Sequence, residues 1–316
     1  MAALIAKKFA KFVGVVLAVT LFASFLLSLL PGDAVSRANP TATAEQKAAI
    51  AKQLGLNDPL IVRWWHWITN AAHLDFGRSL TRGTPVWDLV RDAIVPTLQL
   101  VILAQLVALA VAIPLGVWSA QRANRTPDKV VSVSTFMLIA IPNFVLAITL
   151  SVYVGSVLGW LPPSGYTSFS DDPGAWFQSM ILPTLALAAG QIAIYQRLLR
   201  SDLIATLQSD FITTARAKGI SDRRVLWRHA LRPSSFSLLT VAAINTGALV
   251  GGAVVIEVIF GLPGMGKRLF ESYQNLDYPT FQAVVAVIAI GYVALNFVVD
   301  IIYTVLDPRT RDVARA

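Results

Sequence analysis

The chain has 316 residues, of which 55% are hydrophobic and only 14% are charged, and its formal net charge is +8. A soluble domain carries about a quarter charged residues, so this composition argues against a soluble globular protein. The basic residues lie mainly in short segments beside long apolar runs, and the sequence contains no zinc-finger or RNP-type motif, so the charge indicates membrane topology rather than nucleic-acid binding. The absence of cysteine excludes disulfides and cysteine-ligated metal or redox sites.

The first apolar run extends from Phe9 to Leu30; Lys7 and Lys8 precede it, and Lys11 lies at its start. It has about the 20 residues that are needed to cross a bilayer. The alternative is a cleaved signal peptide, but the apolar core is long for one, and Leu29-Leu30-Pro31 is a poor cleavage site. We therefore predict a retained transmembrane helix over residues 1–30.

Residues 31–96 are polar, mixed in charge and rich in tryptophan. Two short amphipathic helices are expected here, at Glu45–Leu54 and Leu60–Ala72, and the second has a tryptophan-rich face suited to a membrane interface. We predict a small extracytoplasmic region, too short for an independent core to be expected.

Five further apolar runs follow, at about Thr97–Trp118, Val131–Leu158, Ile181–Leu199, Phe236–Phe260 and Phe281–Leu306. The sequence therefore predicts an all-α integral membrane protein with six transmembrane helices, a five-helix core over residues 97–306 and a tail over residues 307–316. The pair Gly251-Gly252 is expected to let two helices approach closely. Lys and Arg are more frequent in the alternate segments that share a side with the N-terminus, which predicts that both termini are cytoplasmic.

The segment 210–233, DFITTARAKGISDRRVLWRHALRP, is polar and lies on the predicted cytoplasmic side. It holds six basic residues: Arg216, Lys218, Arg223, Arg224, Arg228 and Arg232. Its pattern predicts a helical hairpin, which we call the basic hairpin. Gly219 is expected to end the first helix, Ser221 to cap the second through its side chain, and Pro233 to stop the second.

The second helix of the basic hairpin carries large apolar residues in a segment too short to span a membrane: Val225, Leu226 and Trp227. The alternative is an ordinary solvated loop held inside by its positive charge. The apolar residues favour a docking surface, because an exposed apolar face is normally covered by lipid or protein.

Polar residues within the apolar runs are candidates for lining a solute pathway: Gln99, Gln105, Asn143, Gln191, Gln196, Asn245, Glu257, Asn296 and Asp300. Of these we select Asn143, Gln191, Asn245 and Glu257. The alternative for each Asn or Gln is an interhelical hydrogen bond worth about 1 kcal/mol. A carboxylate such as that of Glu257 is expensive within a span unless it is hydrated or paired.

The stretch from Gly261 to Lys267 matches the first seven positions of a phosphate-binding P-loop, but Arg268 stands where Ser or Thr should hold Mg²⁺. The predicted topology places it outside, away from ATP. His66 and His73 have no third ligand nearby in sequence, and no catalytic pattern of nucleophile and base is present. We therefore predict a non-enzymatic chain without a metal site, a bound cofactor or its own ATPase site.

Several motifs together resemble a known family. Within the basic hairpin these are residues 213–219 (TTARAKG), 223–226 (RRVL) and 229–231 (HAL), which resemble the EAA loop of binding-protein-dependent ABC importers. Thr213 stands where the general pattern has Glu. Further matching segments are LPGD (30–33), LGL (54–56), DFGRS (75–79), GTPV (83–86), GGAVVIE (251–257), PGMG (263–266), DYP (277–279) and LDPR (306–309). The match is closest to permease subunits of the dipeptide/oligopeptide group.

The resemblance implies the type I ABC importer permease fold, in a multi-pass protein of the bacterial cell membrane. The implied partners are a second homologous permease subunit, two ATPase subunits (or one two-domain ATPase) that bind ATP and Mg²⁺, an extracytoplasmic substrate-binding protein, a peptide substrate and membrane lipid. The implied ATPase-coupling residues are Thr213, Ala215, Ala217, Gly219, Ser221, Arg223, Arg224, Val225, Leu226, Arg228 and Leu231.

Two alternatives remain open. The first is an importer of the same family for another solute, such as glutathione, a nickel complex, haem or an oligosaccharide. The second is a stand-alone secondary transporter, which is disfavoured because the chain has six predicted spans without an inverted repeat.

Overall fold

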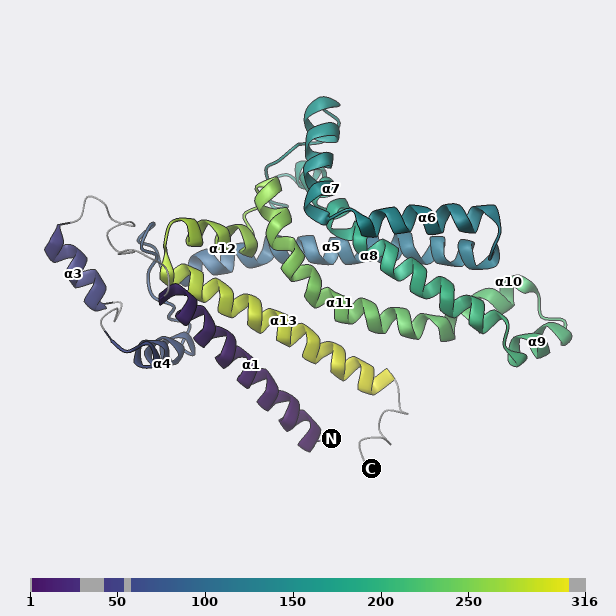
Figure 1. The fold of residues 1–316 in the computed structure, drawn as a ribbon, viewed down its shortest axis with the longest axis horizontal. Helices are drawn as coiled ribbons and strands as arrows, with labels where there is room; N and C mark the ends of the chain where they lie inside the picture. Colours follow the sequence, from purple (N-terminus) through teal and green to yellow (C-terminus); the bar gives the residue numbers. More distant parts are fainter. Residues whose placement is uncertain (1, 29–42, 54–57, 307–316) are drawn as a thin grey trace. The chain divides into compact units, whose positions relative to one another are not determined.

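The computed structural model describes residues 2–28, 43–53 and 58–306 (Figure 1). Within these residues the chain is helical, apart from connecting turns and one isolated antiparallel bridge between Arg78 and Pro85. Two compact units are present: unit 1 contains residues 1–98 and 261–298, and unit 2 is formed mainly by residues 99–260. The predicted tail 307–316, and the LPGD and LGL motifs of the predicted extracytoplasmic region, lie outside the described residues.

Unit 1 joins the N-terminal region to helices from the end of the chain. A cluster of buried residues from the two parts forms its core: Phe76, Val86, Val90, Ala93, Met265, Ala283 and Val284. The elements of this unit are α1 (Ala2–Ser28), α3 (Ala44–Gln53), α4 (Leu60–Ala71), the start of α5 (Val86–Gln121), α12 (Met265–Gln274) and α13 (Tyr278–Leu306). The region after the first helix therefore buries its apolar side chains against α12 and α13 rather than in a core of its own.

A tight turn before α5 brings several of the sequence motifs together. The amide of Ser79 donates to the carbonyl of Thr84 at 2.9 Å, which closes the turn. Asp277, just before α13, then holds it: its carboxylate accepts hydrogen bonds from the Ser79 hydroxyl (2.5 Å) and from the backbone N–H of Leu80 (3.0 Å). Motifs 75–79 and 277–279, about 200 residues apart in sequence, thus form one structural contact.

Helix α5 begins earlier than the predicted second span, at Val86 instead of Thr97. Pro96, the last residue of the predicted extracytoplasmic region 31–96, lies inside this helix. Val86, Val90 and Ala93 are fully buried in the core of unit 1, so packing holds the segment helical across the proline.

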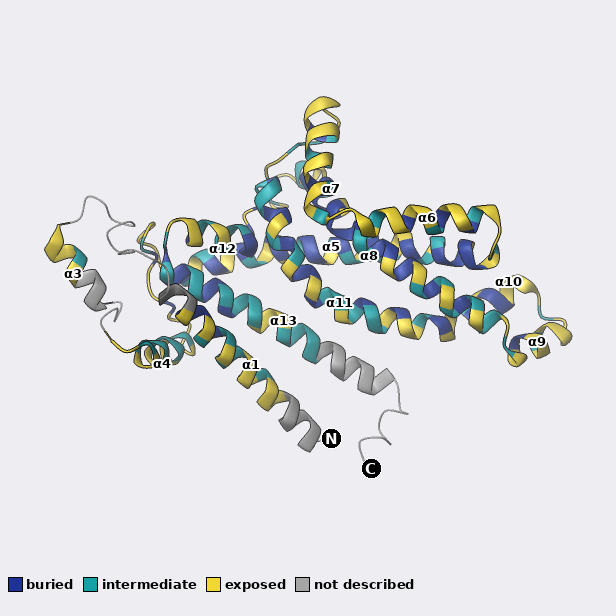
Figure 2. Cartoon of the chain, in the orientation of Figure 1, coloured by how far each residue is buried: buried dark blue, intermediate teal, exposed yellow. Residues whose placement is uncertain are grey.

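Unit 2 is built around α8, whose middle part is largely buried (Figure 2). It starts where the Asp172 carboxylate accepts hydrogen bonds from the N–H groups of Gly174 and Ala175, and Pro173 occupies the first helical turn. Helices α6, α7 and α11 pack against it. The other elements are the rest of α5, α6 (Thr126–Ala140), α7 (Asn143–Thr149), the π-helical η1 (Leu150–Val157), α8 (Pro173–Leu207), α9 (Asp210–Ala217), α10 (Asp222–Arg224), the π-helical η2 (Val225–Ala230) and α11 (Leu231–Phe260).

The predicted close approach at the glycine pair occurs at one of its two members. A Cβ atom on Gly252 would lie 3.1 Å from the Leu187 side chain, so α11 and α8 pack at this point with little room to spare. Gly251 faces open space.

The prediction of one uninterrupted span over residues 131–158 is wrong. Helix α6 ends at Ala140, α7 begins at Asn143, and the two parts are bent by 96°. The break lies at Ile141, which is extended, followed by Pro142. The residue before a proline is disfavoured in the helical region, and proline itself has no N–H to donate, so the chain turns here.

The described helices that are long and apolar enough to cross a membrane number four, or five if the bent pair counts as one span. The four are Val86–Gln121, Pro173–Leu207, Asp222–Phe260 and Tyr278–Phe297, and the shorter apolar segment Phe9–Phe25 belongs to α1. The all-α membrane architecture is confirmed, while the count of six spans stays a prediction.

Candidate functional site

The first limb of the basic hairpin is α9, and it ends as the sequence predicts. The N–H of Gly219 donates to the carbonyl of Arg216 at 2.9 Å, and the N–H of Ile220 donates to that of Ala215 at 3.3 Å. This pair of bonds is the Schellman motif, which satisfies the last carbonyls of a helix. Gly219 has φ +76°, a left-handed conformation that side chains other than glycine adopt only at a cost.

The second limb of the basic hairpin consists of α10 and η2. Its helix does not stop at Pro233, contrary to the prediction. Residues 222–260 run as one continuous helix from α10 through η2 into α11. Helix η2 has the wider i→i+5 hydrogen-bond pattern, and it lies directly before the turn that contains Pro233. Because proline lacks an N–H, a local change of hydrogen-bond register lets the helix pass through it. The second helix of the basic hairpin is therefore continuous with a membrane span.

Ser221 occupies the predicted N-cap position, but its side chain accepts no backbone N–H, so the predicted side-chain cap is wrong. The Ser221 carbonyl instead accepts the Val225 N–H at 2.9 Å. Across the turn, Arg216 pairs with Asp222 at 3.2 Å. Both of these side chains are well exposed, so this ion pair adds little stability, and the turn depends mainly on its backbone.

The apolar residues of the second limb divide into buried and exposed ones. Val225 and Leu226 are 1% and 5% exposed, and η2 packs against α8 and α9. These two residues, which were expected to anchor a partner, are instead part of the internal packing of the hairpin. Trp227 is 53% exposed and Phe211, on α9, is 51% exposed. These two aromatic side chains are available to a partner.

Most other residues assigned to coupling lie at the surface of the hairpin. All six basic side chains are exposed, and Asp210 and Asp222 are the acidic residues among them. Thr213, Ala217, Gly219 and Ser221 are also exposed, whereas Ala215 and Leu231 are half-buried. The hairpin therefore presents an excess of positive charge beside exposed aromatic rings.

Two features that the sequence did not reveal hold the hairpin against its neighbours in unit 2. Ile212 on α9 is fully buried. The hydroxyl of Ser234, at the start of α11, donates to that of Thr206, near the end of α8, at 2.9 Å. The hairpin thus belongs to the packed body of unit 2.

A buried ion pair ties three helices of unit 2 together, and it too was missed. Asp128 on α6 accepts two hydrogen bonds from Arg200 on α8, from Nε at 2.5 Å and from the terminal guanidinium nitrogen at 2.6 Å. The Ser119 hydroxyl on α5 and the Asn124 N–H, the latter at 2.8 Å, donate to the same carboxylate. Asp128 is 3% exposed and Arg200 is 23% exposed at the side chain. One feature of the sequence could have indicated this ion pair: Asp128 is the one acidic residue in the basic segment 122–129.

Two of the selected pathway candidates meet in a polar network between helices. The Asn245 amide on α11 donates to the Gln191 amide oxygen on α8 at 3.0 Å. One turn away, the Tyr195 hydroxyl donates to Gln105 on α5 at 3.1 Å, and Gln105 donates to the carbonyl of Ala242 at 3.3 Å. These bonds join different helices, as expected if the polar residues serve helix packing instead of lining a solute pathway. A role in lining a pathway stays a prediction.

Three other pathway candidates are half-buried or fully buried. Asn143, at the start of α7, is half-buried, and its side-chain oxygen would lie 3.5 Å from a Cβ atom on Gly190. Glu257 is fully buried within α11. Gln196 is also fully buried, and neither atom of its side-chain amide has a hydrogen-bond partner among the described residues.

The P-loop-like stretch connects two helices, α11 and α12. A nucleotide-binding P-loop follows a β-strand and precedes a helix, and here a helix stands in place of the strand. Lys267 donates to the Gly261 carbonyl at 3.1 Å, within the stretch itself. The geometry agrees with a helix-connecting turn.

Comparison with known families gives a match over most of the chain. The family described as "Binding-protein-dependent transport system inner membrane component" matches residues 112–312. A peptide transport system permease protein of Brucella abortus is 38% identical over 98% of this chain and 99% of that protein. The glutathione transport system permease protein GsiC of Salmonella choleraesuis is 35% identical over 93% of this chain and 94% of that protein.

A solved structure shows a similar fold. A chain from the inward-facing MetNI methionine ABC transporter aligns with a TM-score of 0.57, covering 69% of this chain and 96% of that chain. The two sequences are 18% identical, so the comparison concerns the fold alone.

Proposed function

Because the chain belongs to the family of binding-protein-dependent transport system inner membrane components, we propose that it forms half of the translocation pathway of an ATP-driven importer of peptides. It is a multi-pass membrane permease subunit of an ABC importer. The proposal adds the solute class, the route of coupling and the orientation, with both termini and the basic hairpin in the cytoplasm. A second permease of the same family completes the pathway, two ATPase subunits supply the energy, and an extracytoplasmic binding protein delivers the solute.

One observation carries the coupling proposal: the basic hairpin is short, exposed and continuous with a membrane span. Residues 222–260 form one helix, so a displacement of the second helix of the hairpin also displaces α11. The packing of η2 on α8 and the hydrogen bond between Ser234 and Thr206 join the same hairpin to α8. Movement of a docked ATPase subunit is then transmitted to two spans as a rigid-body displacement, which gives alternating access.

The surface of the hairpin suits an acidic groove with an apolar floor. Trp227 and Phe211 supply apolar contact area, and aromatic residues often dominate binding energy in interfaces. Arg223, Arg224 and Arg228 are exposed beside Trp227, where they attract acidic residues at the rim of a partner.

The peptide assignment is supported by the names of the relatives and by the sequence motifs. One relative is named for peptide transport and another for glutathione, which is itself a tripeptide. Glutathione is therefore the second candidate solute. Mass spectrometry of what co-purifies with the binding protein identifies the solute directly.

The coupling proposal is tested in vesicles that contain the complete transporter. ATP is supplied or withheld on the side of the membrane that carries the ATPase subunits. We expect uptake to stop when ATP or the ATPase subunits are omitted. Trp227→Ala is expected to reduce uptake at least about tenfold, because hot-spot aromatics contribute about 2 kcal/mol or more. The matched control is Trp160→Ala, which removes a 73% exposed tryptophan outside the hairpin and leaves uptake unchanged.

Uptake that persists without ATP would support the stand-alone secondary transporter instead. Equal uptake by the Trp227→Ala variant and the unchanged protein would refute docking through this face. Labelling of a cysteine introduced at position 220 only from the extracytoplasmic side would refute the proposed orientation.

A further inference from the structure

Helix α4 turns one face toward the rest of unit 1 and leaves the other face open. Trp64 donates its indole N–H to the Thr20 hydroxyl on α1 at 3.1 Å, and Trp67 packs against the buried core of unit 1. Two of the three tryptophans of α4 therefore contact protein, although the sequence suggested that a tryptophan-rich face meets the membrane. The face that remains open has a different composition.

The open face of α4 consists of two stripes of exposed residues spaced four apart: Ile61, Trp65 and Thr69 in the first, and Val62, His66 and Asn70 in the second. We call the first the apolar stripe, because Ile61 is 62% exposed and Trp65 is 58% exposed. The Thr69 hydroxyl at its end donates to the carbonyl of His66 at 2.9 Å, within the helix, so it needs no water. The second stripe changes from an apolar residue to two polar ones. The open face thus has an apolar side and a polar edge.

Contacts with α1 and α13 place α4 at the level of a membrane span. Gln282, in the second turn of α13, donates to the Ser24 hydroxyl of α1 at 2.7 Å. Figure 1 shows α1 and α13 side by side, with the end of α1 near the start of α13. Thr20, which binds Trp64, precedes Ser24 by one turn, or about 6 Å along α1. Helix α4 therefore contacts α1 alongside the first turns of the span 278–297.

The apolar stripe also adjoins the apolar surface of α1. The ring of Trp65 lies 6.2 Å, between centroids, from that of Trp64, the residue that contacts α1. Between Val13 and Phe25, none of the exposed residues of α1 is polar or charged, and Phe22 is 59% exposed. A helix surface of this composition is suited to lipid. The stripe beside it faces the same surroundings.

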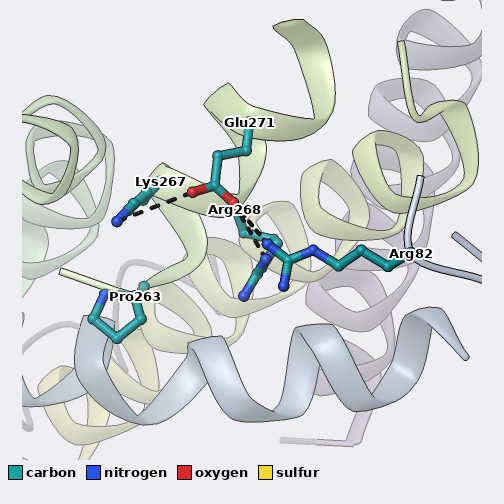
Figure 3. Close-up of a pocket in the computed structure, with 6 residues that line it drawn as sticks. Arg82, Pro263, Lys267, Arg268 and Glu271 are labelled. Carbon is teal, nitrogen blue, oxygen red and sulfur yellow. Dashed lines mark hydrogen bonds and ion pairs between the residues drawn. The ribbon is translucent and has the colours of Figure 1, made fainter. Parts of the chain in front are cut away.

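Charged side chains of unit 1 gather elsewhere. Around α12, Glu271 pairs with Arg268 at 3.2 Å and with Arg82 at 3.4 Å, in the cleft that Figure 3 shows. The exposed residues of α4 include no Lys, Arg, Asp or Glu, and its arginine, Arg63, is half-buried and interacts with Tyr278. The open face of α4 thus offers apolar contact without exposed ion-pairing groups.

We propose that α4 lies in the headgroup region of the bilayer, with Ile61, Val62 and Trp65 in contact with lipid and with His66 and Asn70 in contact with water. Tryptophan is enriched in this region, and an amphipathic helix there buries its apolar side while its polar edge stays hydrated. The level of α4 beside α13 and the lack of exposed charge favour lipid over a protein partner. Helix α4 then anchors the region after α1 to the membrane surface. The proposal requires only that the permease lies in a membrane, and it is independent of the solute and of the ATPase subunits.

The test uses single-cysteine variants, since the sequence contains no cysteine. The complete transporter, with cysteine-free partner subunits, carries one spin label in lipid nanodiscs. Collisions with oxygen, which concentrates among acyl chains, are compared with collisions with a water-soluble nickel chelate. We expect the ratio of oxygen to nickel accessibility to be several-fold higher for Ile61→Cys and Trp65→Cys than for His66→Cys and Asn70→Cys, the matched controls on the same helix.

A second measurement leaves α4 unchanged. A phospholipid with a photoreactive diazirine near the top of its acyl chain should modify the segment 60–71 of the unsubstituted transporter, as detected by mass spectrometry after proteolysis. Equal nickel accessibility at all four labelled positions would show that the face is in water and would overturn the proposal. Low accessibility to both reagents at positions 61 and 65 would overturn it in favour of a protein partner. A photoreactive lipid that modifies α13 but not residues 60–71 would also overturn it.

Discussion

Replacing Gly219 by alanine isolates the backbone geometry of the turn in the basic hairpin. Gly219 has φ +76°, and no atom lies within 4 Å of the position that a Cβ would occupy. Alanine therefore meets no steric obstacle, and its whole effect is the cost of the left-handed backbone conformation. That cost is about 1–2 kcal/mol for a residue with a side chain. The substitution thus weakens one turn without disturbing the core.

The expected size of the effect on coupling follows from this cost. If the ATPase subunit recognises the hairpin only with this turn formed, the 1–2 kcal/mol is subtracted from the docking free energy. A difference of 1.4 kcal/mol corresponds to a factor of ten in affinity, so Gly219→Ala should weaken docking about five- to thirtyfold. Gly219→Asn should weaken it less, because asparagine tolerates the left-handed region better.

The assay titrates ATPase subunits against the permease pair in nanodiscs, with ATP-dependent uptake as a second readout. Gly159 provides a matched control: it has φ +64°, also has no atom within 4 Å of a Cβ position, and lies outside the hairpin. Gly159→Ala imposes similar backbone strain and should leave docking unchanged. Unaltered affinity in Gly219→Ala, or equal losses in both alanine variants, would refute the reasoning.

Two further predictions concern the buried carboxylates. Asp128→Asn should lower the free energy of unfolding by about 3–5 kcal/mol, because it leaves Arg200 without its charged partner, and thermal unfolding in detergent measures this. Adding Arg200→Met should recover much of the loss, and a single variant as stable as the unchanged protein would contradict the ion-pair role. Asp277→Asn should loosen the turn that holds Leu80, so the Leu80 amide should exchange with solvent at least about tenfold faster, since a hydrogen bond to a charged group is worth about 1.5–3 kcal/mol. Unchanged exchange at Leu80 would show that the turn does not depend on Asp277.

The chain's own sequence determined the features that depend on local chemistry. Apolar runs of span length predicted an all-helical membrane protein, because a bilayer leaves the backbone few other ways to satisfy its hydrogen bonds. Gly219 predicted the break in the hairpin, since a glycine at a helix end supplies the left-handed conformation of a Schellman turn. The resemblance of the hairpin motifs to the EAA loop indicated the family.

Prolines show the limit of local reasoning. Pro142 breaks the helix, whereas Pro96 and Pro233 lie within continuous helices. The three have the same missing N–H and the same fixed φ angle. What differs is the surroundings: buried residues hold the start of α5 in the core of unit 1, and the π-helical η2 shifts the hydrogen-bond register before Pro233.

Only the tertiary structure decided which side chains are available to act. Val225, Leu226 and Trp227 are three consecutive apolar residues, and the sequence gives no reason to separate them. Packing of η2 on α8 and α9 buries the first two and leaves the tryptophan exposed. Likewise, Asp128 and Arg200 stand 72 residues apart, and Arg82 and Glu271 stand 189 apart. Composition and periodicity determine which segments are helical and apolar, but contacts between distant segments depend on how the helices pack, because that packing sets which charges meet and which surfaces remain open.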